Sequence, residues 1–503
     1  MDTPQSPLPI IVVSVPLLVA FILPVVGWWK RSAVFPLALA ALVACFVVSV
    51  ATARAVLSHG PINHYLGGWE PPWGIAFRID HLSALMLLLL SFVTLIVGVY
   101  SKRSVLHELP DKEVPFYCIY LLLVTGLVGI VSTADMFNLY VFLEIASITS
   151  YALVSLGGGA AVVSAFRYVI LGTVGAAFYL LSVGYLYSVT GSLNMADLSR
   201  VLPELYSSNA VLVGFAFFVI GMSIKMALFP MHAWLPGAYS NAPSAVSALI
   251  AATTTKVATY VLIRVMFYVF EPRFSIEMIP VTQLLSWMGA IAMVLGSVMA
   301  IAQTDLKRML AYSSVAQIGY IVLGLGLANA SGFIGGVLHL VNHAVVKGCL
   351  FLVAGAIVYR MDKREIRDLR NLSTKMPWSA AAFTVAAFAI IGIPPTGGFF
   401  SKLYLILGAI NAEAWVFVGV ILLSSVLALA YFVNVIRYMY FPASADGELS
   451  LASDEPAPRR LDAPLPMLVP ILVLTVAIIG LGIFNGEIVA RFLEPTLPTS
   501  FIR

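Results

Sequence analysis

The chain has 503 residues, of which 61% are hydrophobic and only 10% are charged. Soluble globular proteins carry about 25% charged residues, so this composition excludes a soluble fold. The net charge of +4 is too small to indicate a nucleic-acid-binding protein. We therefore predict an all-α polytopic membrane protein.

A membrane-spanning helix needs about 20 apolar residues. By this criterion the sequence predicts fourteen spans, at 8–28, 34–56, 80–100, 115–133, 136–156, 163–188, 210–235, 243–268, 281–303, 307–328, 333–358, 378–408, 414–440 and 465–490. The residues before the first span, MDTPQSP, lack the basic segment of a signal peptide, so we expect that span to be retained.

An even number of spans places both termini on one side of the membrane. Lysine and arginine concentrate in the loops of the opposite side, for example at Lys30, Arg31 and within 360–375. Loops rich in these residues stay in the cytoplasm, so we expect both termini to face outward. The expected location is the cytoplasmic membrane.

Glu144 is the first ionisable residue predicted deep in the membrane. It lies about 12 Å along a helix from Met136. A nearby ammonium group would stabilise its negative charge there, and we expect Lys225 to be that partner. The alternative is a protonated Glu144 bonded to a backbone carbonyl. Arg167, in the next span, either is buried or extends to the cytoplasmic surface.

Two apolar helices joined by a short turn follow in the segment 221–264, and each carries one lysine, Lys225 or Lys256. A lysine at the bilayer centre costs roughly 2.5–3.5 kcal/mol, so two of them indicate a function. We therefore predict an ion or proton path through this part of the molecule.

The first of these two helices is expected to break at Pro230 and to end near Pro236. A broken helix is tolerated in lipid only where protein or a water-filled cavity satisfies the freed backbone groups. His232 lies at this break. It either faces such a cavity or is a hydrogen-bonded loop histidine.

Asp305, Lys307 and Arg308 are expected to form a polar hinge between two spans, on the side opposite the termini. The segment 441–464 contains SADGELSLASDEPAPRR and is expected to be an exposed loop. The segment 441–464 predicts no chemistry.

His339, His343 and Lys347 are spaced four residues apart, so they form one polar stripe on an otherwise apolar helix. Such a stripe offers proton donors and acceptors in series, which favours a proton relay. Two alternatives remain: a zinc site, for which no further ligands are apparent, and histidines that are simply hydrogen-bonded within the core.

A second broken helix is predicted in AIIGIPPTGGFFSKLYLIL, where Lys402 follows two prolines and two glycines. It comes five spans after the first, so the two broken helices run in opposite directions. Paired broken spans of this kind indicate an inverted repeat with its sites near the membrane midplane.

The sequence contains no P-loop, GxGxxG, HExxH or CxxC motif, and Cys45, Cys118 and Cys349 have no metal-site spacing. We therefore expect no cofactor, no metal and no catalytic site of the chain's own. The energy for transport must then come from an ion gradient or from a partner subunit.

Five segments together resemble the antiporter-like subunits of respiratory complex I, membrane-bound hydrogenases and Mrp cation/proton antiporters. They are KMALFPMHAWLP, TTTKVATYVLIR, TDLKRMLAYSSVAQIGY, NHAVVKGCLFLVAG and IPPTGGFFSK. The resemblance implies fourteen helices, an inverted five-helix repeat of spans 4–8 and 9–13, and broken helices 7 and 12. The implied parts are a three-helix segment at 1–110, repeats at 111–270 and 271–440, and a loop with the last helix at 441–503.

The same resemblance implies a role for each buried ionisable residue. Glu144 and Lys225 would form the family's gating pair, and Lys256 would be the central connecting lysine. His339, His343 and Lys347 would be relay residues, and Lys402 the terminal lysine. Arg167 and His232 are secondary candidates.

The segments GSLNMADL and KMPWSAAAF most resemble the D-type subunit of Mrp antiporters, followed by the N-type subunit of complex I. Lys402, where the M type has a glutamate, argues against that type, and the short end after the last span argues against the L type. We therefore expect a proton-translocating subunit of a multi-subunit Na⁺/H⁺ antiporter. The alternative is a proton-pumping subunit of a redox complex, and a stand-alone organic-solute carrier is the third class. Other membrane subunits are the expected partners.

Overall fold

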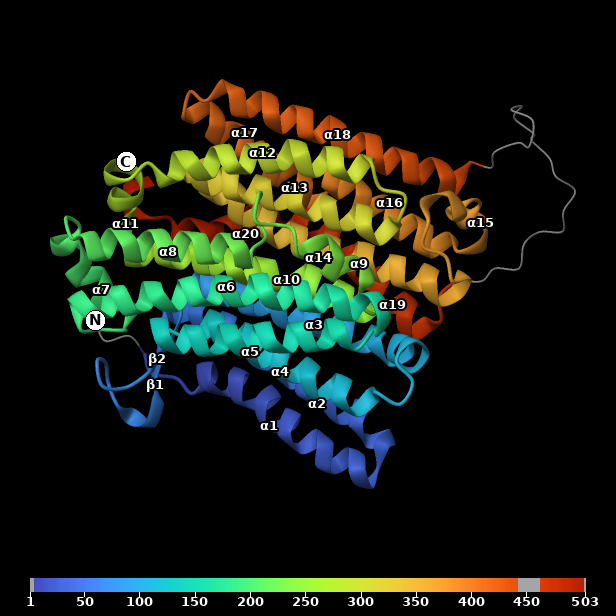
Figure 1. Ribbon diagram of the computed structural model, residues 1–503, viewed down its shortest axis with the longest axis horizontal. Helices are drawn as coiled ribbons and strands as arrows, with labels where there is room; N and C mark the ends of the chain where they lie inside the picture. The colour runs from blue at the N-terminus through green and yellow to red at the C-terminus, as the bar shows by residue number, and fades with distance from the viewer. Residues whose placement is uncertain (1–3, 442–461, 502–503) are drawn as a thin grey trace, which may run out of the picture.

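Long apolar helices pack side by side throughout this computed structural model, which describes residues 4–441 and 462–501 (Figure 1). In this described part, 12 helices are long and apolar enough to cross a membrane. The two broken helices complete the fourteen predicted spans. Most of the loop expected at 441–464 lies outside the described residues. The two ends of the chain lie at the same end of the bundle (Figure 1).

The bounds of the long helices agree with the predicted spans to within a few residues at most ends. They are α1 (Leu8–Trp29), α2 (Val34–His59), α3 (His81–Glu108), α4 (Glu113–Ser132), α5 (Met136–Ser155), α6 (Gly159–Thr190), α10 (Ser244–Arg264), α12 (Val281–Ile301), α13 (Leu306–Gly326), α14 (Ala330–Met361), α18 (Trp415–Tyr440) and α19 (Leu465–Ile483).

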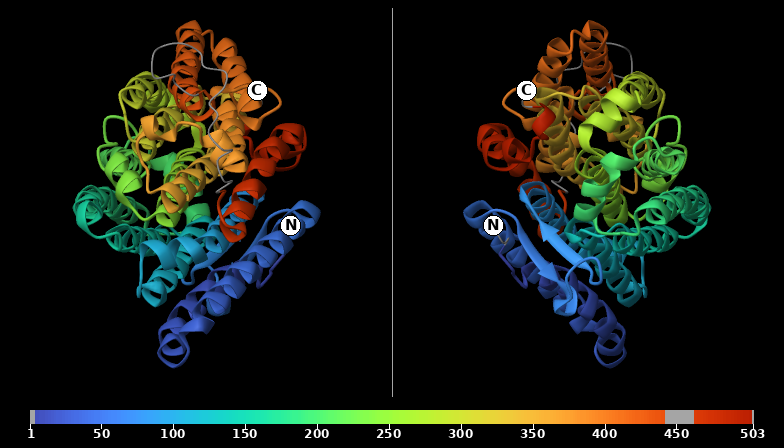
Figure 2. Two further views of the ribbon diagram at one scale, coloured as in Figure 1. Left: turned by 90° about the vertical axis from the view of Figure 1, so that its right-hand side faces the viewer. Right: turned by 90° about the vertical axis from the view of Figure 1, so that its left-hand side faces the viewer.

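Shorter elements connect the long helices. Strands β1 (Ile62–Tyr65) and β2 (Ala76–Ile79) form an antiparallel hairpin, with Ile62 opposite Ile79, at the end of the bundle where the termini lie (Figure 2). The short helices are α7 (Met195–Val201), α11 (Glu271–Arg273), α15 (Leu372–Lys375) and α20 (Asn485–Ile488).

The first broken helix consists of α8 (Asn209–Lys225) and α9 (Leu235–Asn241). The break therefore covers residues 226–234 and contains Pro230, as predicted, whereas the second piece continues beyond Pro236, so the predicted end of the helix is wrong. Ala227 leaves the helix with a φ of 58°. Pro236 is tolerated because it lies in the first turn of α9, where backbone N–H groups have no partner within the helix.

The second broken helix consists of α16 (Pro377–Ile391) and α17 (Gly397–Asn411), as its prolines and glycines predict. The chain leaves α16 through Gly392, whose φ of 94° suits glycine. Lys402, on α17, donates hydrogen bonds to the carbonyls of Ile390 (2.8 Å) and Ile391 (3.0 Å). These carbonyls belong to the last turn of α16 and lack partners within that helix. Lys402 therefore joins the two pieces across the break.

The two halves of the bundle repeat one local arrangement. Asp135 caps the start of α5 and Asp305 caps the start of α13, each through a 2.7 Å bond from a backbone N–H. Each aspartate also forms a β-bridge to the segment that follows the next helix, at Asn194 and Glu365 respectively. Those next helices, α6 and α14, both have 32 residues. The elements after them, α7 and α15, lie at opposite ends of the bundle, as an inverted repeat requires (Figure 1).

The helix α10 lies at the centre of the bundle and carries Lys256. Its two ends are held by the two ends of α3. Asp80, which precedes α3, pairs with Arg264 at the end of α10, and Glu108, at the end of α3, accepts a hydrogen bond from the backbone N–H of Ser244. The helix that carries Lys256 is therefore fixed at both ends.

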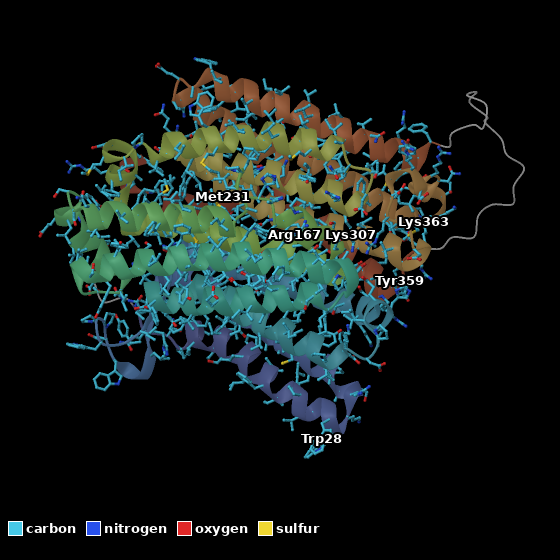
Figure 3. The ribbon with its side chains drawn as sticks, in the orientation of Figure 1. Trp28, Arg167, Met231, Lys307, Tyr359 and Lys363 are labelled. Carbon is cyan, nitrogen blue, oxygen red and sulfur yellow. The ribbon has the colours of Figure 1, made fainter. Side chains whose placement is uncertain are left out.

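Lys307 lies at the junction of two spans, as expected, but it is buried. Lys307 is the second residue of α13 and is only 2% exposed. Its side chain points toward the start of α10. Its ammonium donates to the Ser244 hydroxyl (3.0 Å) and to the Ala242 carbonyl (3.3 Å). These two oxygens take the place of water. Figure 3 marks its position toward the end of the bundle that also carries Lys363.

Candidate functional site

Glu144 and Lys225 face each other, as predicted, with 3.6 Å between the ammonium nitrogen and one carboxylate oxygen. That oxygen has no hydrogen-bond partner within the described residues, whereas Lys225 donates a 2.7 Å hydrogen bond to the Ser147 hydroxyl. The Lys225 side chain is 8% exposed and that of Glu144 is 26% exposed. The two charges therefore attract each other without being locked by a direct hydrogen bond.

The break after Lys225 is closed by an aromatic side chain. Trp234 donates its indole N–H to the carbonyl of Ile224, one of the last carbonyls of α8, at 3.0 Å. His232 is buried in the same turn, with its ring stacked on Phe229 at 5.2 Å between centroids. The Nδ1 atom of His232 has no partner in the part of the chain that the structure describes. His232 is thus a buried loop histidine with one ring nitrogen available.

Lys256 is 1% exposed, in the middle of α10. Its ammonium donates to the carbonyl of Ala251 and lies 3.4 Å from the Thr255 hydroxyl. Among the described residues no carboxylate lies within 4.0 Å of it. Its partners are therefore oxygen atoms without negative charge, and a buried charge without a counter-charge is costly.

The stripe of His339, His343 and Lys347 lies along α14 and is buried. Lys347 donates to the carbonyl of Leu310 (2.8 Å) and to the hydroxyl of Ser313 (2.9 Å), both on α13. Lys347 therefore also has oxygen partners without negative charge.

The two histidines of the stripe differ in their surroundings. His339 lies between the Ser401 hydroxyl and the Gln317 side-chain oxygen, each at 2.9 Å from one ring nitrogen. Neither nitrogen of His343 has a partner within the described residues, and its ring stacks on His339 at 6.5 Å between centroids. His339 thus links α13 to α17, and His343 has both nitrogens free to bind water.

Lys402 is 5% exposed and has the largest set of partners among these lysines. Besides the two carbonyls of α16, it donates to the Ser425 hydroxyl on α18 at 3.0 Å. Its ammonium also lies 4.6 Å from the centre of the Tyr320 ring, at the distance of a cation–π contact.

These residues form one row across the bundle. The row passes from α5 and α8 through α10 and α14 to α17; in Figure 1, α10 and α14 lie between α5 in the lower part of the molecule and α17 in the upper part. The row contains one carboxylate, Glu144, together with four buried lysines and two histidines. Within the described residues, no group of His, Cys, Asp or Glu side chains could hold a metal ion.

Arg167 lies outside this row. It is exposed on α6, where it lines a surface cavity of about 380 Å³ together with Asn241, Arg308 and Tyr312 (Figure 3). The structure therefore does not bring Arg167 to the other candidates.

Sequence reasoning missed the neutral partners of the row. Ser147, Ser313, Gln317, Ser401 and Ser425 supply its oxygen atoms. A signal exists for two of them, because Ser147 follows the capping residue Asp135 by the same spacing as Gln317 follows Asp305. Aligning the two halves on their capping aspartates would have found this pair.

A family model described as NADH:quinone oxidoreductase/Mrp antiporter, TM, matches residues 133–428. The chain is 45% identical over 500 residues to NADH-quinone oxidoreductase subunit N of Desulforudis audaxviator, covering 98% of each chain. It is 31% identical over 465 residues to the D-type subunit of the Na(+)/H(+) antiporter of Alkalihalophilus pseudofirmus, covering 91% of each.

Two solved structures share the fold over nearly the whole chain. A chain of the membrane-bound sulfane sulfur reductase, an archaeal respiratory membrane complex, superimposes with a TM-score of 0.88 at 29% identity, covering 99% of each chain. A chain of the Mrp complex from Dietzia sp. superimposes with a TM-score of 0.84 at 27% identity, covering 97% of this chain and 98% of that one. Both neighbours are parts of multi-subunit membrane complexes.

Proposed function

This chain belongs to the NADH:quinone oxidoreductase/Mrp antiporter family of membrane subunits, and we propose that it conducts protons along its buried row of ionisable residues. The observation that carries this proposal is the row itself. Four lysines and two histidines are buried in the middle of an apolar bundle and bond mainly to hydroxyls and backbone carbonyls. Ionisable residues are costly in a membrane interior and mark ion or proton pathways.

In this proposal Glu144 and Lys225 gate one half of the path. Their 3.6 Å separation supports this role, because the contact can tighten or open without breaking a direct hydrogen bond. Lys256 connects the two halves, His339, His343 and Lys347 form the relay, and Lys402 ends it. We also propose that the N-terminal segment, the two repeats and the C-terminal part meet near residues 110, 270 and 440.

The driving force is proposed to be an exchange of Na⁺ for H⁺ in a hetero-oligomeric antiporter. The relative named as a Na(+)/H(+) antiporter component and the Mrp neighbour support this reading. The alternative, a proton pump in a redox complex, is supported by the 45% identity to a protein named NADH-quinone oxidoreductase subunit N. Both functions would use the same row of residues.

Everted membrane vesicles from the native host would test the function and separate the two forms of it. The pH gradient would be followed with a fluorescent amine, in vesicles with and without this chain. Under Na⁺/H⁺ exchange, added NaCl collapses a preformed gradient. Under redox pumping, an added electron donor builds one. If deletion of the chain alters neither response, the proposed translocation is wrong.

The composition of the purified complex gives an independent answer. Flavin or iron–sulfur absorption, with hydrophilic dehydrogenase subunits, would identify a redox-driven pump. A colourless assembly of membrane subunits would identify a secondary antiporter.

The proposed location is the cytoplasmic membrane, with both termini outside. The end of the bundle that carries Lys363, opposite the termini, would then face the cytoplasm (Figure 3). In cells whose wall or outer membrane has been removed but whose cytoplasmic membrane is intact, an added protease should cleave a tag from the C-terminus. Protection of the tag in these cells, together with its removal in everted vesicles, would reverse the orientation.

A further inference from the structure

We propose that a chain of hydroxyl groups, completed by one buried water molecule, carries protons between Lys225 and Lys256, with Tyr168 and Tyr239 as its two aromatic members. This inference rests on the proposed proton translocation. It assigns relay residues that are not ionised themselves.

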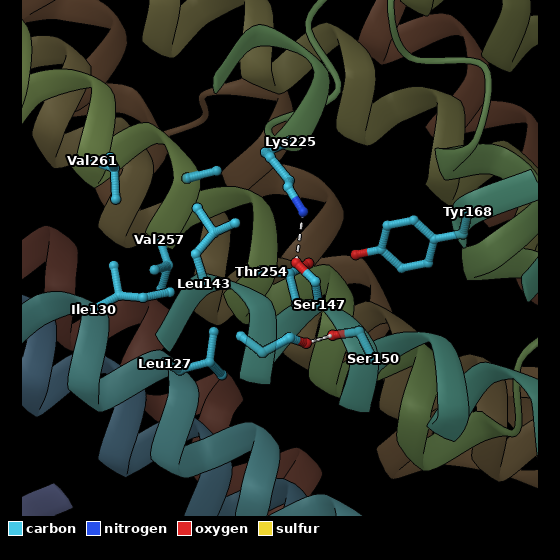
Figure 4. Close-up of a pocket in the computed structure, with 12 residues that line it drawn as sticks. Leu127, Ile130, Leu143, Ser147, Ser150, Tyr168, Lys225, Thr254, Val257 and Val261 are labelled. Carbon is cyan, nitrogen blue, oxygen red and sulfur yellow. Dashed lines mark hydrogen bonds between the residues drawn. The ribbon is translucent and has the colours of Figure 1, made fainter. Parts of the chain in front are cut away.

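The path begins at Lys225, whose ammonium donates to the Ser147 hydroxyl at 2.7 Å. Beside this contact lies a cavity of about 40 Å³ (Figure 4). Its polar lining consists of Lys225, Ser147, Ser150, Tyr168 and Thr254, and the remaining lining residues are apolar. A water molecule needs a cavity of at least about 10–15 Å³ and two to four polar partners. The cavity therefore satisfies the conditions for one or two bound waters.

Tyr168 continues the path from this cavity to α10. Figure 4 shows its hydroxyl directed into the cavity, toward Ser147 and Thr254. Tyr168, Ser150 and Thr254 all line this one cavity, so a water molecule bound in it can contact all three hydroxyl groups. Because a hydroxyl group both donates and accepts a hydrogen bond, each of these groups can receive a proton on one side and release one on the other.

Tyr239 completes the path to Lys256. Its hydroxyl donates to the carbonyl of Ile250 at 3.2 Å, and the Thr254 hydroxyl donates to the same carbonyl at 2.9 Å, so the two hydroxyl groups lie close to each other. The Thr255 hydroxyl lies 3.4 Å from the Lys256 ammonium. Tyr239 is completely buried, so protons passing here have little access to bulk water.

One tryptophan holds both tyrosines. The Tyr168 ring stacks on Trp234 at 4.0 Å with an interplanar angle of 1°, and Tyr239 meets the edge of the same indole at 6.3 Å. Trp234 is itself fixed to the end of α8 through the Ile224 carbonyl. The relay is therefore attached to the broken helix, so a rearrangement at the break would also move its two tyrosines.

The proton balance is simple. Lys225 gives one proton to the Ser147 oxygen, and each following hydroxyl or water takes up one proton while passing its own to the next. Thr255 finally delivers one proton to the neutral Lys256 amine. For every O–H bond formed one is broken, so no hydroxyl stays ionised, and the chain is reset by rotation of the hydroxyl groups.

The test uses the whole complex in everted vesicles and compares variants that remove single hydroxyl groups. Tyr168→Phe, Tyr239→Phe and Thr254→Val keep the shape of each side chain and are expected to lower the rate of proton transport roughly tenfold or more. Thr254→Ser, which restores a hydroxyl, should recover most of the rate lost in Thr254→Val. Tyr120→Phe is the matched control, because Tyr120 is also buried and, within the described residues, its hydroxyl bonds only to the backbone carbonyl of Thr94.

Lys225→Ala is measured in the same assay, and assembly is checked by affinity purification through a tag on this chain. If Lys225→Ala is inactive while all hydroxyl variants transport normally, the relay is wrong and the proposed function stands. If Lys225→Ala transports normally as well, the proposed function is wrong. If a tyrosine variant fails to assemble, the comparison of Thr254→Val with Thr254→Ser decides, and equal rates in these two variants overturn the relay.

Discussion

Asp80 and Arg264 form a bidentate ion pair between the start of α3 and the end of α10, with nitrogen–oxygen distances of 2.6 and 2.8 Å. Arg264 also donates to the Ser83 hydroxyl at 2.9 Å. Burial alone would raise the pKa of the Asp80 carboxyl, but the adjacent Arg264 guanidinium and the hydrogen bonds from Ser83 hold this pKa well below its usual range. The pair anchors the helix that carries Lys256, so its loss should be seen in stability.

The contribution of Asp80 to stability should depend on pH. Because its pKa is lower in the folded protein than in the unfolded chain, the carboxylate stabilises the fold fully above about pH 4, and the contribution is lost as the pH falls further. We expect Asp80→Asn to lower the unfolding temperature at neutral pH, by an amount that shrinks as the pH falls from about 4 to about 3. Thermal unfolding of the purified complex in detergent measures this difference.

Asp111→Asn is the control for that experiment. Asp111 pairs with Arg31 at 3.6 Å, but both side chains are largely exposed, and such surface pairs contribute little. A difference between Asp80→Asn and the unaltered protein that stays constant across this pH range would contradict the assignment to the carboxylate.

The other end of α10 makes a second stability prediction. Glu108 accepts the backbone N–H of Ser244 at 2.8 Å and thereby caps a helix to which it does not belong. Loss of a helix cap typically costs about 1 kcal/mol, so Glu108→Ala should destabilise the protein by that order of magnitude. Glu108→Gln keeps an accepting oxygen and should cost less. Chemical or thermal unfolding, with the exposed Glu70→Ala as control, measures the effect.

Glu144→Gln should abolish proton transport while the complex still assembles. The substitution keeps the size of the side chain and removes the group that can exchange a proton with Lys225 across 3.6 Å. A positioned acid or base typically contributes a factor of about 10²–10⁴ in rate, so the loss should exceed roughly tenfold. Transport in everted vesicles gives the rate, and Glu204→Gln, on the exposed surface, serves as control. Near-normal exchange in Glu144→Gln would exclude the gating role.

Lys256→Arg should also lower transport by roughly tenfold or more, although it keeps the positive charge. A guanidinium does not release its proton at physiological pH, so it cannot pass one to a relay. The same assay applies, with the exposed Lys363→Arg as matched control. Full activity in Lys256→Arg would show that position 256 needs only a fixed charge.

The sequence alone predicted the helical bundle, both broken helices and the contact of Glu144 with Lys225. These features can be read from short stretches of sequence, because a lysine or a helix break in an apolar span costs free energy wherever it occurs. The roles assigned to the buried residues stay predictions.

The groups that accept hydrogen bonds from the buried lysines could not be predicted in the same way. Lys347 bonds to Ser313 on α13, and Lys402 bonds to Ser425 on α18, so each acceptor comes from another helix. The burial of Lys307 was missed for the same reason, since its acceptors are the carbonyl of Ala242, in the turn before α10, and the hydroxyl of Ser244, the first residue of α10. A sequence shows the charge of a lysine but not the oxygens that tertiary packing brings to it.

The inverted pairing of the two halves has a consequence for the direction of transport. Asp135 and Asp305 cap equivalent helices that run in opposite directions. Each side of the membrane therefore faces the equivalent end of one of the two repeats. On the proposed function, such a conductor is reversible and has no forward direction of its own. The partner subunits must then act as the rectifier, which explains how one fold can belong both to exchangers and to pumps.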